Sequence, residues 1–137
     1  MTEYPFGDEH VRVYRETDGE TGHEWREGST ILLLTTKGRK TGLDRTVPLI
    51  YDLEGTNPVI VASKGGAPDH PGWFKNLVQT PEAEIQILDR HVPVRAREAE
   101  GDERAQLWAQ MNRMWPHYEE DQAKTDRRIP VVVLETE

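Results

Sequence analysis

The segment ILLLTTKGRKTGLDRTVPLIYDL, residues 31–53, holds two strand-like runs on either side of a short basic loop. The first run, ILLLTT, opens with four consecutive apolar residues, which is typical of a strand that is buried on both faces. The second run, TVPLIYDL, alternates in character, so that Val47, Leu49 and Tyr51 lie on one side of the strand. Two strands this close in the sequence favour an antiparallel sheet.

Four further stretches have strand character, and they follow one another with few helices between them. They are PVIVAS (58–63), AEIQIL (83–88), HVPVRAR (91–97) and IPVVVLE (129–135). AEIQIL and HVPVRAR are separated only by Asp89 and Arg90 and predict a hairpin. Pro93 indicates that the second strand of this hairpin lies at a sheet edge, because proline cannot donate a hydrogen bond to a neighbouring strand.

Three segments have helical patterns: PGWFKNLVQT (71–80), DERAQLWAQMNRMW (102–115) and the short HYEEDQAKT (117–125). Residues 1–28 are polar and contain several glycines, and they predict an arm or short helix followed by a loop. Because the strands are not regularly separated by helices, a doubly wound parallel sheet is excluded. The sequence predicts a mainly β protein, a small antiparallel β-barrel with flanking helices.

The charge and composition exclude several classes of protein. The 137 residues include 17 Lys and Arg and 25 Asp and Glu, a net charge of −8, which disfavours binding to nucleic acid or to an anionic membrane surface. No apolar run approaches the length of a bilayer span, and MTEYPFGDEH has no apolar signal core. We therefore expect a single-domain cytoplasmic protein with no integral membrane segment. Without cysteine, and with five scattered histidines, the chain is expected to hold no metal.

The loop between the first two strands concentrates positive charge in this acidic chain. Lys37, Arg39, Lys40 and Arg45 lie close together, with Asp44 as the only acid among them. Arginine and lysine bind phosphate and carboxylate, and the loop glycines allow backbone amides to approach an oxyanion. The P-loop pattern is absent, and a strand rather than a helix follows. Composition alone leaves a solvated turn as an equal alternative, while the net charge of −8 around the loop favours an anion site.

Two other segments combine polar and aromatic side chains. ASKGGAPDHPGWFKN (62–76) follows a strand end with Lys64 and two glycines, and its Trp73 and Phe74 are suited to form the wall of a pocket for a flat anionic ligand. MWPHYEEDQAKTDRRIP (114–130) offers Trp115 and Tyr118 in the same way. Taken alone, each segment is better explained by ordinary packing. No nucleophile elbow or acid–base pair is present, so any chemistry belongs to a bound cofactor.

Taken together, these segments resemble the deazaflavin (F420)-dependent nitroreductase family. LLTTKGRKTGLDRTVPL (33–49), VIVASKGGAPDHPGWFKNLVQTPEAEIQI (59–87) and YEEDQAKTDRRIPVVVLE (118–135) occur in the family's order and at similar spacing. YRETDGETGHEW (14–25) resembles the lead-in of the family, which leaves residues 1–13 as an N-terminal arm before a domain at 14–137. The resemblance implies a split β-barrel of the FMN-binding-protein type that binds coenzyme F420, a cofactor with a phosphate and a polyglutamate tail.

The resemblance also implies roles for individual residues. The cofactor-binding residues would be Arg39, Lys40, Thr41, Arg45 and Lys64 for the phosphate and tail, and Pro48, Val61, Ala62, Ser63, Trp73 and Asn76 for the deazaflavin ring. The catalytic polar groups would be Ser63 and Tyr118, and the substrate side would comprise Trp115, Tyr118 and Asp121. Asp121 stands where the family commonly has tyrosine, so the acceptor is expected to differ from that of relatives.

The implied activity is hydride transfer from reduced F420 to a small acceptor such as a quinone, a nitro compound or an activated alkene. Two alternatives are an FMN- or FAD-binding oxidoreductase on the same barrel and a non-catalytic F420 carrier. A homodimer is a further possibility, because split barrels often pair, although no exposed apolar seam is evident in the sequence.

Overall fold

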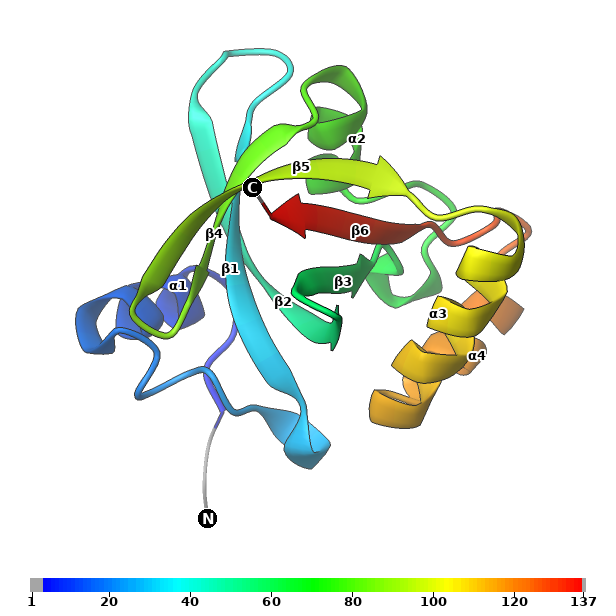
Figure 1. The fold of residues 1–137 in the computed structure, drawn as a ribbon, viewed down its shortest axis with the longest axis horizontal. Helices are drawn as coiled ribbons and strands as arrows, with labels where there is room; N and C mark the ends of the chain where they lie inside the picture. The colour runs from blue at the N-terminus through cyan, green and yellow to red at the C-terminus, as the bar shows by residue number, and fades with distance from the viewer. Residues whose placement is uncertain (1–3, 137) are drawn as a thin grey trace.

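The computed structural model describes residues 4–136, which form a closed barrel of six antiparallel strands in the order β1-β2-β3-β6-β5-β4 (Figure 1). The strands are β1 (Thr30–Lys37), β2 (Asp44–Glu54), β3 (Asn57–Val61), β4 (Glu82–Ile87), β5 (Arg90–Glu98) and β6 (Val131–Thr136). The helices are α1 (Gly7–Thr17), α2 (Gly72–Gln79), α3 (Gly101–Met114) and α4 (His117–Ala123), with 3₁₀ turns at Arg26–Gly28 and Lys64–Gly66. The predicted mainly β barrel with flanking helices is confirmed.

The first hairpin explains the apolar run at its start. β1 pairs with β2 from Thr30 opposite Tyr51 to Lys37 opposite Asp44, and its other edge pairs with β4. Leu32 and Leu34 point into the barrel core, while Ile31 and Leu33 pack outside it in a cluster with α1. Both faces of β1 are therefore covered, as the continuous apolar pattern predicts.

The prediction that HVPVRAR forms an edge strand is wrong. β5 pairs with β4 on one side and with β6 on the other, so that the barrel closes without an edge. Pro93 is tolerated because the register with β6 begins one residue later, at Val94. The missing N–H therefore lies where the strand has only one neighbour, and the proline marks the start of the paired region.

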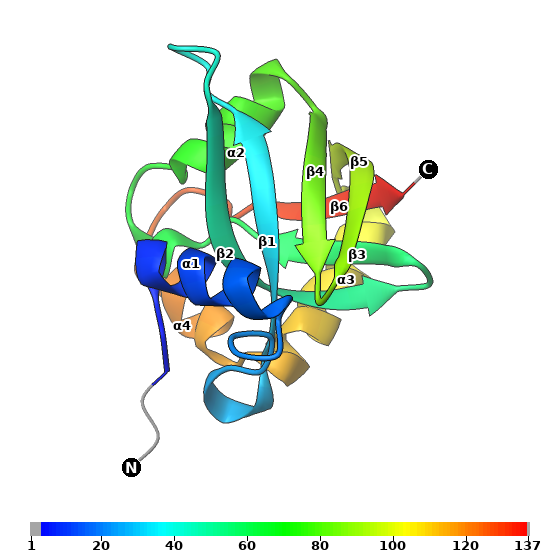
Figure 2. The same cartoon turned by 90° about the vertical axis from the view of Figure 1, so that its left-hand side faces the viewer.

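The N-terminal segment forms the three-turn helix α1, which lies against β2 (Figure 2). Tyr14 fixes the helix: its hydroxyl donates to the Ile31 carbonyl at 3.0 Å and accepts from the Leu88 amide at 2.8 Å. Burial raises the pKa of Tyr14 to about 12, so this phenol is neutral at ordinary pH. Buried His10 contacts the Gly22 carbonyl at 2.9 Å and ties the helix to the loop that follows it.

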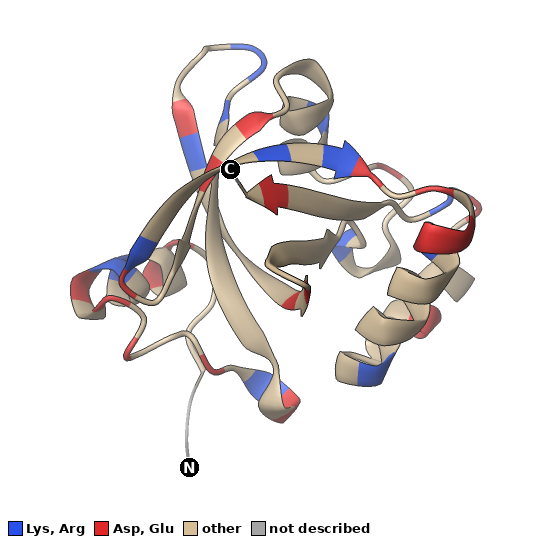
Figure 3. Cartoon of the chain, viewed as in Figure 1, with Lys and Arg blue, Asp and Glu red and all other residues tan. Residues whose placement is uncertain are grey.

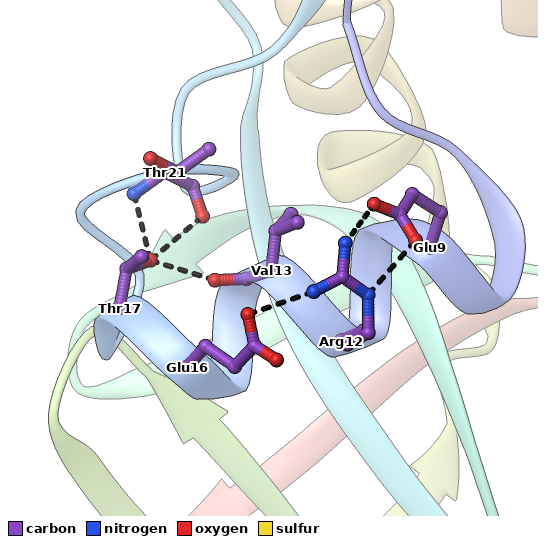
Figure 4. A network of polar contacts seen from close by, with 6 residues as sticks. All are labelled: Glu9, Arg12, Val13, Glu16, Thr17 and Thr21. Atoms are coloured by element: carbon purple, nitrogen blue, oxygen red, sulfur yellow. Dashed lines mark hydrogen bonds and ion pairs between the residues drawn. The ribbon is translucent and has the colours of Figure 1, made fainter.

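The solvent-facing side of α1 carries a separate polar network (Figure 4). Arg12 pairs with Glu9 and, at 2.8 Å, with Glu16. The Thr17 hydroxyl donates to the Val13 carbonyl at 2.7 Å and accepts from the Thr21 amide at 2.9 Å. Because these ion pairs are exposed, they contribute little to stability compared with the buried face of the helix.

Helices α3 and α4 cover the opposite side of the barrel (Figure 1). Leu107, Met111 and Tyr118 pack with residues of β3 and β6 in a second core. The buried Arg104 donates to the Ile129 carbonyl at 2.7 Å, which anchors α3 to the segment before β6. Among the helices of residues 4–136, none has the length and apolar character needed to cross a membrane.

Candidate functional site

Two adjoining cavities lie along β2 and share the Trp73 side chain. The first, of about 450 Å³, is rich in aromatic residues and is called the aromatic cavity below; it includes Pro48, Ser63 and Tyr118. The second, of about 390 Å³, is called the basic cavity and lies under the β1–β2 loop. Figure 3 shows the lysines and arginines of this loop at the top of the barrel, beside α2. Together the cavities make an elongated site with one cationic and one aromatic end.

The basic cavity gathers predicted residues from two elements. Its lining includes Arg39, Lys40, Thr41 and Arg45 of the loop region, and Trp73 and Asn76 of α2. The ion pairs formed within residues 4–136 involve other side chains, and none of these loop cations has a carboxylate partner there. Unpaired cations held around one cavity in a chain of net charge −8 favour an anionic ligand.

Asn76 holds Arg39 in place. The amide oxygen of Asn76 accepts from the backbone N–H of Arg39 at 3.1 Å and from its guanidinium at 3.0 Å. The amide nitrogen donates to the Thr36 hydroxyl at 3.0 Å, and Asn76 itself is buried. Asn76 therefore uses its hydrogen-bonding groups within the protein and orients the arginine toward the cavity.

The loop that carries these cations is a tight turn. The Gly38 amide donates to the Leu43 carbonyl and the Gly42 amide to the Gly38 carbonyl, each at 2.8 Å. Gly42 has a φ of +74°, which favours glycine, and the Thr41 hydroxyl oxygen accepts from the Leu43 amide at 3.2 Å. The turn keeps Lys40 and Arg45 near the same opening.

The aromatic cavity brings together the middle of β2 and the end of β3 with α2 and α4. Pro48, Val61, Ser63, Lys64, Trp73, Trp115, Tyr118 and Asp121 all line it. The resemblance assigns Lys64 to the phosphate and tail, but in the structure Lys64 lines this cavity and not the basic one. Ala62 lines neither cavity: it is fully buried, its N–H donates to the Pro130 carbonyl and its carbonyl accepts from Arg127. The neighbouring Val61 and Ser63 are thus the residues of this strand end that reach the cavity.

Tyr118 presents a hydroxyl without a hydrogen bond to any residue of 4–136. Only 4% of the residue is exposed, yet it lines the aromatic cavity. Burial, and to a lesser extent the nearby Asp121 charge, raises the pKa of Tyr118. The phenol therefore remains protonated and is suited to donate a hydrogen bond to an oxygen bound in the cavity.

The turn after β3 has an unusual backbone. Ser63 is right-handed helical (φ −77°, ψ −42°), and Lys64, Gly65 and Gly66 have φ of 47°, 64° and 82°. In the described chain, the N–H groups of Ser63, Lys64 and Gly65 have no hydrogen-bond acceptor. A right-handed residue followed by a left-handed one makes a concave arrangement of N–H groups that favours partial negative charge.

Arg127 fixes this turn, and sequence reasoning missed it. Its guanidinium donates to the carbonyls of Ser63 (2.6 Å), Ala67 (2.8 Å) and Ala62 (3.1 Å) and to Nδ1 of His70 (3.1 Å). Burial lowers the pKa of Arg127, although arginine stays charged at any physiological pH. Nothing in the spacing of TDRRIP distinguishes Arg127 from an exposed arginine, because its partners lie about sixty residues earlier in the chain.

The N-terminal segment contributes another wall that the sequence did not indicate. Phe6, His10 and Trp25 line the aromatic cavity. Trp25 donates to the Pro5 carbonyl at 2.8 Å, and its ring centroid is 5.8 Å from that of Trp115. The closeness of Trp25 to Trp115 could have been found only from the fold. Within residues 4–136, no three side chains of His, Asp or Glu come together as metal ligands.

A histidine ties this N-terminal wall to α4. Nε2 of His117 lies 2.8 Å from Glu27, and its Nδ1 lies 2.8 Å from Glu120. The contact with Glu27 raises the pKa of His117 most, and the contact with Glu120 raises it further above its usual value. The imidazolium is therefore favoured in the folded protein, where it links the turn at Arg26–Gly28 to α4.

We expect this link to weaken as the pH rises. Because the pKa of His117 is higher in the folded protein than in the unfolded chain, the charged histidine stabilises the fold. This contribution is complete below about pH 6.5, the unfolded pKa, and is lost as the pH rises through the folded pKa. The melting temperature of the parent minus that of His117→Gln should therefore be larger at about pH 6 than at about pH 8. The exposed His91 on β5 provides a control, His91→Gln. An equal difference at both pH values would contradict the assignment.

Comparison with known proteins agrees with this geometry. The family model described as F420H(2)-dependent quinone reductase matches residues 7–136. An F420H(2)-dependent quinone reductase of Mycobacterium tuberculosis is 40% identical over 128 residues, which cover 91% of this chain and 86% of that protein.

Solved structures agree as well. A structure titled as an F420-H2 dependent reductase has a TM-score of 0.71 and 44% identity, over 77% of this chain and 93% of that one. Another, titled as a domain-swapped dimer, has a TM-score of 0.74 and 41% identity, over 91% of this chain and 96% of that one. The resemblance stated from the sequence, with its F420 cofactor and its oxidoreductase class, is confirmed. The chain belongs to the F420H(2)-dependent quinone reductase family.

Proposed function

We propose that this oxidoreductase passes hydride from reduced F420 to a quinone. The observation that carries the proposal is the elongated site, in which a basic cavity continues along Trp73 into an aromatic one. A cofactor with an anionic tail and a flat ring needs such a pair of environments. In the overall reaction the quinone gains a hydride and a proton and becomes a hydroquinone, while the reduced cofactor loses both.

The cationic end would hold the phosphate and glutamyl groups. Arg39 offers a guanidinium already oriented by Asn76, and Lys40 and Arg45 add charge at the same opening. Thr41 lines the same cavity and would add a polar contact, whereas Lys64 would meet the cofactor from the aromatic cavity. Because the protein has fixed the arginine before binding, less conformational entropy is lost when the anion arrives.

The ring would lie between the middle of β2 and the end of β3. Pro48 of β2, Val61 and Ser63 after β3, and Trp73 of α2 surround this part of the aromatic cavity. When bound, the deazaflavin supplies the hydride. The protein would hold the ring and the acceptor face to face, with Trp25 and Trp115 limiting access of water.

Tyr118 and Ser63 would stabilise the acceptor as it is reduced. Negative charge develops on a quinone oxygen as hydride arrives, and preorganised donors stabilise that charge more than the neutral ground state. The Tyr118 hydroxyl has no hydrogen-bond partner in residues 4–136 and remains protonated. It is the stronger candidate donor, with the Ser63 hydroxyl at the strand end as the second.

The test is oxidation of reduced F420 by a quinone, a nitro compound and an activated alkene under the same conditions. We expect the quinone to give the highest kcat/KM. Tyr118→Phe should lower kcat/KM for the quinone roughly 10- to 100-fold while leaving F420 affinity unchanged, because one donor to developing charge is lost. Tight F420 binding without turnover of any acceptor would instead identify a carrier.

Two further proposals concern the location of the enzyme and its oligomeric state. We propose that the enzyme works in the cytoplasm, in line with its lack of cysteine and its charge. We also propose a homodimer, since a structural relative with 41% identity is titled as a domain-swapped dimer. Light scattering after gel filtration tests the second: a mass near 15.7 kDa would show a monomer.

A further inference from the structure

The aromatic cavity contains a carboxylate that the proposed function does not use. The Asp121 side chain, on α4, is only 13% exposed and lines the cavity. It accepts no hydrogen bond from residues 4–136, and its nearest cation is the exposed Lys124 amine at 3.9 Å, the limit of an ion pair. A partly buried carboxylate with so few partners in the protein is available to a hydrogen-bond donor or a cation bound in the cavity.

The position of this carboxylate is fixed by the backbone around it. The Asp121 carbonyl accepts from the Lys124 amide at 3.0 Å. A Cβ added to Gly66 would lie 2.5 Å from the same carbonyl, so α4 and the turn after β3 are in direct contact. Asp121 is thus held beside the Ser63–Gly66 turn and on the same helix as Tyr118.

Tyr118 and Asp121 form a complementary pair. The phenol is a donor without an acceptor, and the carboxylate is an acceptor without a donor, and both line one cavity. A ligand that fits both must accept a hydrogen bond at one atom and offer a donor or a positive charge nearby. A quinone carbonyl satisfies Tyr118 alone, whereas a hydrogen-bond donor or a positive charge on a ring substituent would satisfy Asp121 as well.

We propose that Asp121 selects the acceptor: quinones with a cationic or hydrogen-bond-donating substituent are favoured and anionic quinones are excluded. This inference rests on the proposed function. Charge interactions are stronger in a largely buried site than in water, so one fixed carboxylate is enough to discriminate. Lys64 also lines the cavity, so the effect of Asp121 is measured by comparing the parent with an Asp121 variant in which Lys64 is unchanged.

The test uses three quinones with the same naphthoquinone ring: a neutral one, one bearing a sulfonate and one bearing a trimethylammonium group. Their affinities are measured by quenching of tryptophan fluorescence, with and without oxidised F420, because Trp25, Trp73 and Trp115 line the cavity. Values of kcat/KM with reduced F420 are measured in parallel. The binding assay does not depend on turnover, so it distinguishes failure of this inference from failure of the proposed function.

The informative variant is Asp121→Asn, with Asp126→Asn as its control. Asp126 is exposed and lies outside the cavity lining, and its replacement by Asn changes the net charge by the same amount. We expect the parent and Asp126→Asn to prefer the cation over the sulfonate roughly tenfold or more, about 1.4 kcal/mol. In Asp121→Asn the ratio should approach one. Asp121→Ser provides a second neutral variant if the asparagine protein does not fold.

The possible results distinguish failure of this inference from failure of the proposed reaction. No preference in the parent, an unchanged preference in both Asp121 variants, or an equal loss in Asp126→Asn would overturn the inference. A charge preference in binding that depends on Asp121, without reduction of any quinone, would support the selective pocket and overturn the proposed reaction.

Discussion

Replacing Gly66 by alanine is expected to destabilise the protein by about 3 kcal/mol and to lower its melting temperature by about 10 °C. Two causes combine. Gly66 has a φ of +82°, which is unfavourable for an L-residue, and the new Cβ would lie 2.5 Å from the Asp121 carbonyl and 3.0 Å from Cβ of Lys124. The first contact is with backbone, so the turn and α4 must move apart.

Gly65 provides the matched control. Its φ of +64° carries the same backbone penalty, but a Cβ added there meets nothing within 4 Å. Gly65→Ala should therefore destabilise by only about 1 kcal/mol. The difference between the two variants in thermal or urea unfolding isolates the steric contact. Equal effects would show that the turn does not press against α4.

Gly66→Ala should also damage the site. The displaced turn carries Ser63, and α4 carries Tyr118 and Asp121, so their relative positions would change. We expect KM for the acceptor to rise in the folded fraction, whereas F420 affinity changes less, because the basic cavity lies on the other side of Trp73.

The second large effect is expected for the double variant Arg39→Ala/Lys40→Ala. Hydrogen bonds to charged groups contribute about 1.5–3 kcal/mol each, and the exposure of Lys40 reduces its share. The loss of F420 affinity should be about 3 kcal/mol, or roughly 100-fold. The remaining dependence of affinity on salt should also be weaker, since fewer cations contact the anion.

The control for this variant removes the same charge elsewhere. Arg90 at the β4–β5 turn and Arg113 on α3 are exposed and line neither cavity. Arg90→Ala/Arg113→Ala should change F420 affinity only through the general field of the protein, by a few-fold at low salt. If both double variants weaken binding equally, the basic cavity has no specific role.

The strands and helices could be predicted because local pattern and tertiary environment agree. Residues 31–34 of ILLLTT are all apolar because the barrel core covers one face of the strand and α1 the other. Pro93 led to the wrong prediction of an edge strand, because a proline affects only the hydrogen bond at its own position. β5 has two neighbouring strands, but at Pro93 it has only one. Barrel closure depends on register between distant strands, which no local pattern contains.

The candidate site could be predicted in part for a similar reason. The cations of the β1–β2 loop stand out by composition, and Arg39, Lys40 and Arg45 do surround one cavity, although Lys37 does not line it. Arg127 and Trp25 could not be found, because their importance comes from contacts with residues far away in sequence. Asn76 was expected to meet the ring, but its amide is occupied by Arg39 and Thr36, contacts that are set by the packing of α2 against β1.

The central claim is that one F420 molecule lies across the basic and aromatic cavities. Titration of the parent protein with F420 and, separately, with FMN tests it most directly. We predict saturable binding of one F420 per chain, tighter than that of FMN and weakened by salt, because the glutamyl tail adds carboxylates for Lys40 and Arg45. An absence of saturable F420 binding, or tighter binding of FMN, would contradict the account.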